Sequence, residues 1–166
     1  LGGRADAMNL WANDWVDIHS NRITTNYAGI CFPGGGYAGD VSGVEAHGNV
    51  ICGNTQFGLR AETDNTGTAD AEGNWWGTDA PGVADVLGPV DYDPWITRSI
   101  SANPPTVAPT TGTSTIQVTY TTAAGYTVPD GHVITWTTSA GTVSPASSTT
   151  SGGIASTMLT GPGSVG

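Results

Sequence analysis

One asparagine-centred phrase recurs three times in the first half of the chain and constrains its fold more than any other feature. Its copies occupy residues 16–32, 44–61 and 69–77. Their alignment places Asn21, Asn49 and Asn74 in equivalent positions, at spacings of 28 and 25 residues. Short segments that repeat about every 25 residues are typical of a solenoid, in which each repeat buries its apolar face against its neighbours. We therefore predict that the three asparagines lie directly above one another in successive layers.

Apolar and polar residues alternate within each copy, which predicts short β-strands with one buried face. The predicted inward residues are Val16, Ile18, Ile23 and Ile30 in the first copy, Val44, Ala46, Ile51 and Leu59 in the second, and Ala69, Ala71 and Trp76 in the third. Asp17, Glu45 and Asp70 alternate with them and are expected to face water. A second equivalent pair, Asn26 and Asn54, recurs five residues after the first asparagine.

The asparagines are expected at the sharp turns between strands. Asparagine tolerates the left-handed backbone conformation, and its amide can bond to the same amide one layer away. The segments between copies, 33–43 and 62–68, are rich in turn-forming residues. Leu1 is expected to match Ile30 and Leu59, so we expect the chain to begin inside a series of layers that continues upstream.

The third copy continues into an aromatic and proline-rich segment. Its sequence reads ADAEGNWWGT at 69–78, AP at 80–81 and GPVDYDPWI at 88–96. These motifs resemble the closing coil of right-handed parallel β-helix proteins of the pectate-lyase-like superfamily, and the resemblance covers residues 1–97. It implies that these residues form the last coils and the cap of such a helix. Large aromatic residues suit a cap because they cover the last apolar layer. The residues predicted to have structural roles are Asn21, Asn49, Asn74, Trp75, Trp76 and Trp95.

Residues 98–113 are rich in Pro, Thr and Ser and predict a semi-rigid linker, unless part of the segment forms the first edge strand of the next domain. Beyond it, alternating segments at 114–122, 132–138 and 154–160 predict short strands of a sandwich. The whole chain is therefore expected to be all-β.

The V-I-T-W strand, the G-T-V-S segment and the T-T-S-G-G-I-A turn of residues 114–166 resemble bacterial immunoglobulin-like repeats of the invasin and intimin type. That family has a further pair of strands after a turn like GPGSVG, so the resemblance implies an incomplete domain here. Either the chain continues, or another chain donates the missing strand.

Composition argues against two kinds of partner. The net charge is −10, Lys is absent, and the four basic residues are all Arg. Such a surface repels a phosphate backbone, so nucleic acid is not an expected partner. No apolar run approaches the ~18 residues that a membrane span requires.

Two groups of residues are candidate metal ligands. His19, His47 and Glu72 each precede a stacked asparagine by two residues, and two histidines with a carboxylate could bind Zn²⁺ or Cu²⁺. The stretch from Asp64 to Asp70 places oxygen ligands around a glycine, so Ca²⁺ is the other possible cofactor, although the spacing does not fit an EF-hand. The alternative in both cases is an ordinary polar surface. Further acidic loop residues are Asp79, Asp85, Asp91 and Asp93.

No catalytic set is predicted, and the chain is not expected to be an enzyme by itself. Asp17 and Glu45 align on the outer face, but Arg22 and Arg60 occupy non-equivalent positions and do not converge with them.

The two cysteines are expected to be free. Cys31 aligns with Arg60 and Cys52 with Thr24, so they fall on different sides of the layer, and we predict two buried or half-buried thiols. Five tryptophans form the remaining candidate group: Trp11, Trp15, Trp75, Trp76 and Trp95. Exposed tryptophans could stack on sugar rings, whereas packing in the core and cap is the commoner role.

We interpret the chain as a segment of a secreted, cell-surface structural protein such as a filament, surface layer, stalk or adhesin. Its expected partners are other copies of itself or adjoining modules, with strand donation as one route. The alternative is a carbohydrate-binding adhesin, or the non-catalytic tail of an enzyme that degrades polysaccharides.

Overall fold

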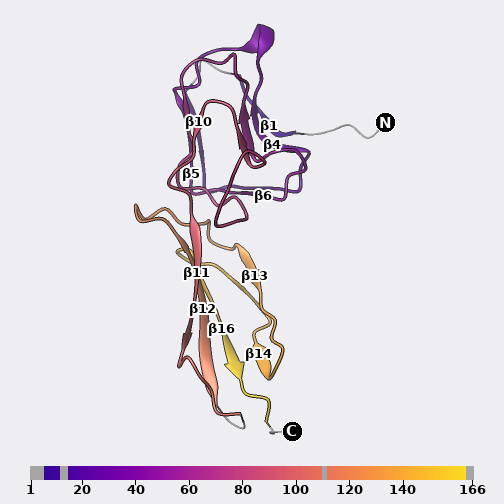
Figure 1. The fold of residues 1–166 in the computed structure, drawn as a ribbon, viewed down its shortest axis with the longest axis vertical. Helices are drawn as coiled ribbons and strands as arrows, with labels where there is room; N and C mark the ends of the chain where they lie inside the picture. The colour runs from indigo at the N-terminus through magenta and orange to yellow at the C-terminus, as the bar shows by residue number, and fades with distance from the viewer. Residues whose placement is uncertain (1–5, 12–14, 110–111, 164–166) are drawn as a thin grey trace, which may run out of the picture. The chain divides into compact units, whose positions relative to one another are not determined.

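The computed structural model describes residues 6–11, 15–109 and 112–163, and the protein is all-β (Figure 1). One short 3₁₀ helix, η1 (Gly35–Tyr37), interrupts the strands of the described residues. The chain divides into two compact units. The first comprises Leu1–Thr97 with Thr121–Val128, and the second comprises Arg98–Tyr120 with Pro129–Gly166.

The first unit contains three parallel sheets in which strands from successive copies of the asparagine phrase pair with one another, and strands from outside the copies extend two of these sheets. The first sheet has the order β1 (Asp6–Asn9), β4 (Ala28–Phe32), β7 (Leu59–Ala61), β9 (Val86–Leu87). The second has the order β10 (Val90–Asp91), β8 (Ala69–Asp70), β5 (Val44–His47), β2 (Val16–His19). The third pairs β3 (Arg22–Thr24) with β6 (Val50–Cys52). Parallel pairing of equivalent segments means that each copy of the phrase lies beside the next.

The observed strand register confirms the predicted alignment of the copies. Val16 to His19 pair in order with Val44 to His47, and Ile30 pairs with Leu59. The upstream neighbour of Ile30 is Met8. The match predicted for Leu1 is therefore wrong, since Met8 occupies that position and Leu1 lies outside the described residues.

Hydrogen bonds join the three stacked asparagines into a ladder. Asn49 Oδ1 accepts from the main-chain nitrogen of Asn21 at 2.8 Å and from its Nδ2 at 3.2 Å. Asn74 Oδ1 accepts the two equivalent bonds from Asn49, both at 2.9 Å. Asn26 and Asn54 repeat the arrangement at another corner, where Asn54 Oδ1 accepts from the main-chain nitrogen of Asn26 at 3.0 Å and from its Nδ2 at 3.2 Å. The predicted stacking of the asparagines is thus confirmed by direct bonds between layers.

The left-handed backbone conformation falls on the residue before each asparagine, and not on the asparagine as predicted. Ser20, Gly48 and Gly73, which precede the three stacked asparagines, have φ of 59°, 63° and 65°. At the second corner Thr25 and Gly53 have φ of 63° and 65°. The sharp turn is made by this residue, so the asparagine keeps an ordinary φ and directs its amide along the ladder.

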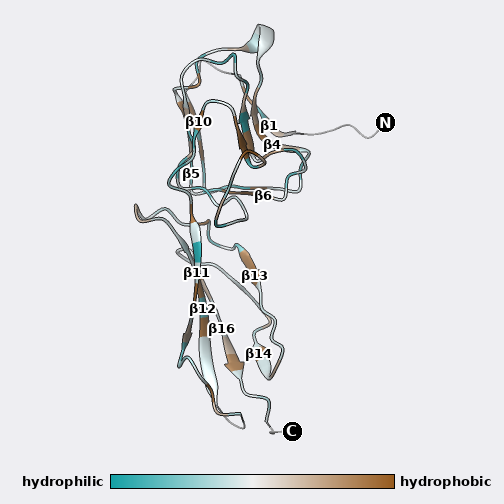
Figure 2. Ribbon diagram, in the orientation of Figure 1, coloured by the Kyte–Doolittle hydropathy of each residue, from teal (hydrophilic) through white to brown (hydrophobic). Residues whose placement is uncertain are grey.

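The alternating apolar residues form one core inside the first unit. Its buried members are Ile18, Ile23, Ile30, Phe32, Val41, Val44, Ala46, Ile51, Leu59, Ala61, Ala69, Ala71, Trp76 and Val86. Val16 is partly buried against this core. Figure 2 shows a strongly hydrophobic stretch at β4, whose five residues are all buried. Every residue that the alternation predicted to point inward therefore packs in or against the core.

The second unit contains a sheet of four strands and a sheet of two. The larger has the order β11 (Thr97–Asn103), β12 (Thr113–Thr121), β16 (Ile154–Thr160), β14 (Thr142–Ser144), and the smaller pairs β13 (Val133–Thr135) with β15 (Ser147–Thr149). Pairing is antiparallel between β12 and β16, β14 and β16, and β13 and β15. Val118, Tyr120 and Ala155 are its buried hydrophobic residues.

The segment predicted as a linker, 98–113, contains most of β11, a strand beside β12. The linker prediction is wrong for this part, and the alternative of an edge strand describes it. All seven residues of β11 are exposed, which explains why no hydrophobic alternation marked it. Residues 121–128, expected within the second domain, cluster instead with the first unit.

Candidate functional site

A column of four carboxylates follows the outward side of the second sheet. Asp17 pairs with Glu45, Glu45 with Asp70, and Asp70 with Asp91 in adjacent strands. Carboxylates opposite one another in neighbouring strands repel. The strand register therefore concentrates four negative charges along one line across the sheet.

The candidate metal ligands His19 and His47 lie side by side, but Glu72 does not join them through its carboxylate. His47 Nδ1 donates to the main-chain oxygen of Glu72 at 2.9 Å, since a carbonyl oxygen can only accept. His47 Nε2 lies 3.7 Å from Asp70 Oδ2, and His19 Nε2 lies 3.8 Å from Asp17 Oδ2. Each imidazole thus faces its own aspartate. Among the described residues, no three His, Cys, Asp or Glu side chains gather to hold a metal ion.

The candidate calcium ligands Asp64 and Asp70 are at different places in the first unit. Asp64 Oδ2 accepts from the main-chain nitrogen of Gly35 at 2.6 Å, and it lies in a loop. Asp70 is in β8, paired with Glu45 and Asp91. The stretch between them does not close into one loop of oxygen ligands, because Ala69 and Asp70 already belong to a strand.

Asp17 and Glu45, the acids weighed for catalysis, lie on β2 and β5, whereas Arg22 lies on β3 and Arg60 on β7. The acids and the two arginines are therefore distributed over three different sheets. Arg60 pairs with Glu62 at 2.9 Å. Of the other acidic residues, Asp85 lies in a loop, where its Oδ2 accepts from the main-chain nitrogen of Gly82. Asp91, expected in a loop, is instead in β10 and belongs to the carboxylate column, and its Oδ1 accepts from the main-chain nitrogen of Asp93.

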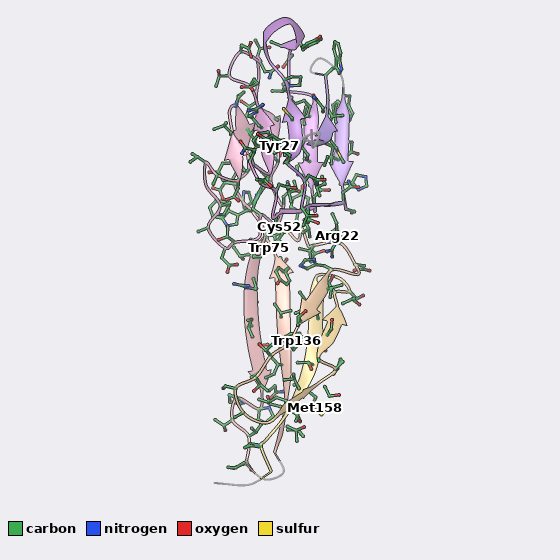
Figure 3. The ribbon with its side chains drawn as sticks, turned by 90° about the vertical axis from the view of Figure 1, so that its right-hand side faces the viewer. Arg22, Tyr27, Cys52, Trp75, Trp136 and Met158 are labelled. Atoms are coloured by element: carbon green, nitrogen blue, oxygen red, sulfur yellow. The ribbon has the colours of Figure 1, made fainter. Side chains whose placement is uncertain are left out.

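Both cysteines are free thiols, as the register predicted. Cys31 is buried in β4, and Cys52 is half-buried in β6, on a different sheet. Figure 3 labels Cys52 with Arg22, which comes from the neighbouring strand β3. Burial raises the pKa of the Cys52 thiol above its ordinary value, while the Arg22 charge opposes this and Asp85 adds to it.

The five tryptophans of the first unit separate into two groups. Trp75 and Trp76 are buried, and Trp95 is partly buried against the core. The ring of Tyr92 contacts both Trp76 and Trp95, with centroid distances of 6.4 Å to Trp76 and 5.9 Å to Trp95. Trp11 and Trp15 are instead 63% and 74% exposed. Core or cap packing therefore describes three of the tryptophans and not the other two.

Trp11 lines a small groove, here called the corner groove, of about 290 Å³. Its lining residues are Asn9, Trp11, Pro33 and Tyr37. The rings of Trp11 and Tyr37 meet edge to face, with centroids 4.7 Å apart and planes at 80°. Sequence reasoning missed Tyr37, although a lone tyrosine in the run PGGGYAG at 33–39 is a recognisable signal.

A second groove, here called the edge groove, lies within the second unit and measures about 380 Å³. It is lined by Arg98, Ile100, Val118, Tyr120, His132, Val133, Ile134, Thr135, Trp136 and Thr137. Ile100 is 65% exposed and Val133 is 54% exposed. The groove therefore presents apolar side chains to solvent beside β13.

No protein-family model, no curated protein and no solved structure matches this chain. Over the described ranges, no helix has the length and apolar character needed to cross a membrane.

Proposed function

We propose that this chain is a segment of a secreted, cell-surface structural protein that assembles through β-modules. In this proposal the first unit consists of coils of a right-handed parallel β-helix, and the second is an immunoglobulin-like sandwich. The observation that carries the proposal is the asparagine ladder, in which each layer bonds to the next through the buried amides of Asn49 and Asn74. Repeating units that bond only to their neighbours suit a stiff, elongated module.

The second unit supplies a means of assembly. Within the described residues, β13 pairs with β15 and has no second neighbouring strand. The main-chain oxygen of His132 accepts from the main-chain nitrogen of Thr150, and the main-chain nitrogen of Trp136 donates to the main-chain oxygen of Ala146, both at 2.9 Å. Along an antiparallel strand, the backbone groups of successive residues point to opposite sides. Since His132 and Trp136 bond toward β15, Val133 directs its N–H and C=O away from β15. This free edge is able to pair with an added strand.

The edge groove favours an added strand of alternating apolar character. Ile100 and Val133 both line it, and both are largely exposed. An extended segment that pairs with β13 would place every second side chain over these residues. The proposed partner is another copy of the chain or an adjoining module of a longer protein.

Sedimentation velocity over a wide concentration range, with electron microscopy of the same samples, tests the proposal. The unmodified chain is expected to form larger, elongated species as its concentration rises. Val133→Lys is expected to stay monomeric, because a charge on the free edge opposes strand addition. Met158→Lys is the matched control, since Met158 is 50% exposed on β16 and does not line the edge groove. A chain that stays monomeric throughout, or equal behaviour of both variants, would contradict assembly through this edge.

A further inference from the structure

The corner groove combines two exposed aromatic rings in a fixed arrangement. Trp11 follows β1, and Tyr37 ends η1, so the pair joins residues from successive layers. Both side chains are more than half exposed, at 63% and 54%. An edge-to-face pair of this kind leaves ring faces open to solvent while each ring limits the motion of the other.

The loop that carries Tyr37 is held by side chains of the next layer. Asp64 accepts from the nitrogen of Gly35 at 2.6 Å, and Asn65 Oδ1 accepts from the nitrogen of Gly39 at 2.9 Å. Asn65 is buried, and its Nδ2 also donates to the main-chain oxygen of Phe32 at 3.2 Å. These bonds lie on both sides of Tyr37 in the chain. Tyr37 is therefore positioned before any ligand binds, which lowers the entropic cost of binding.

We propose that the corner groove binds a neutral carbohydrate, with one pyranose ring stacked on Trp11 and Tyr37. The axial C–H groups give a pyranose ring an apolar face that packs on an aromatic ring, while its hydroxyls stay hydrated or bond to amides. The exposed side chain of Asn9 lines the same groove and can supply such an amide. A volume of about 290 Å³ is at the small end for ligand sites, which suits a single ring of a longer chain.

Charge near the groove selects neutral sugars over acidic ones. The same loop borders a neighbouring hollow of about 430 Å³, lined by Gly34, Gly35, Glu62, Thr63 and Asp64. Two of these residues are carboxylates, Glu62, which is paired with Arg60, and Asp64, and the whole chain carries a net charge of −10. A uronate residue that extended from the corner groove over this hollow would be repelled. This site is independent of the proposed assembly through β13, since it lies wholly within the first unit.

Isothermal titration of the 166-residue chain with three neutral hexasaccharides (cellohexaose, mannohexaose and chitohexaose) tests the site, with hexagalacturonate as the acidic probe. At least one neutral probe is expected to bind, and the acidic probe is not. Trp11→Ala and Tyr37→Ala are each expected to weaken binding about tenfold or more, because each removes one stacking surface. Trp11→Phe is expected to retain most of the affinity.

Trp15→Ala is the matched control, because Trp15, at 74%, is even more exposed than Trp11 but does not line the corner groove. It is expected to leave affinity unchanged, and thermal unfolding of each variant verifies that folding is intact. The proposal is overturned if no neutral probe binds, if hexagalacturonate binds as well as they do, or if the two alanine variants bind like the Trp15→Ala control. Self-association that is lost in Trp11→Ala and prevents sugar binding would assign the groove to a protein contact and would also overturn it.

Discussion

Removal of the Asn49 side chain gives the most direct test of the asparagine ladder. Asn49 is fully buried. Its Oδ1 accepts two bonds from Asn21, and its Nδ2 donates to the main-chain oxygen of Ile18 at 2.7 Å and to Asn74 Oδ1 at 2.9 Å. At about 1 kcal/mol for each of the four bonds, Asn49→Ala is expected to lower the free energy of unfolding of the first unit by about 4 kcal/mol.

Asn21 is the matched comparison within the same ladder. Its side chain is only partly buried and makes two bonds, to His19 O at 2.9 Å and to Asn49 Oδ1 at 3.2 Å. The bond to His19 is exposed and competes with water. Asn21→Ala is therefore expected to cost about 1 kcal/mol, so the two variants should differ by about two decades in the unfolding equilibrium constant.

Urea unfolding followed by tryptophan fluorescence measures the difference. Trp136 is the tryptophan of the second unit, so a Trp136→Phe background restricts the signal to the first unit. Asn49→Asp, which keeps the shape but replaces two donors by acceptors, is expected to cost at least as much as Asn49→Ala. Equal costs for Asn21→Ala and Asn49→Ala, or a cost below about 1 kcal/mol for Asn49→Ala, would refute the reasoning.

Backbone conformation, thiol burial and surface charge each give a further measurable outcome. Thr25→Gly is expected to raise the unfolding temperature and to increase the free energy of unfolding by at most about 1 kcal/mol. The reason is that Thr25 holds a φ of 63°, which is unfavourable for a β-branched residue. A lower unfolding temperature for the variant would contradict this. Iodoacetamide is expected to react with Cys52 before the buried Cys31, with a midpoint pH above that of a free thiol, because burial raises the pKa of Cys52. Since the pKa of Cys52 is higher in the folded than in the unfolded state, the native state binds more protons at a pH between the two pKa values. The free energy of unfolding should therefore fall as the pH rises through the folded pKa. A midpoint pH for the iodoacetamide reaction at or below that of a free thiol would contradict the raised pKa. Glu45→Gln is expected to raise the unfolding temperature at low ionic strength and to have little effect at high salt, since Glu45 lies between two stacked aspartates; no effect at low salt would show that the column does not repel.

The sequence by itself determined the layering of the first unit. The spacing of Asn21, Asn49 and Asn74 sets which residues face one another, because each amide needs the next amide as its hydrogen-bond partner. Period-two alternation then decides which side chains are buried, as Ile18 and Ala46 show. Both signals are local and repeated, so they are readable without knowing how distant parts of the chain pack.

Only the tertiary structure decided the features that depend on contacts between non-equivalent segments. Trp11 and Tyr37 meet at 4.7 Å although no repeat relates them, and Asp64 holds the Tyr37 loop instead of joining Asp70 around an ion. Strand β11 carries no alternation, because both of its faces are exposed, and it forms by pairing with β12. In each case the position of a residue follows from a partner far along the chain, and no local pattern encodes that partner.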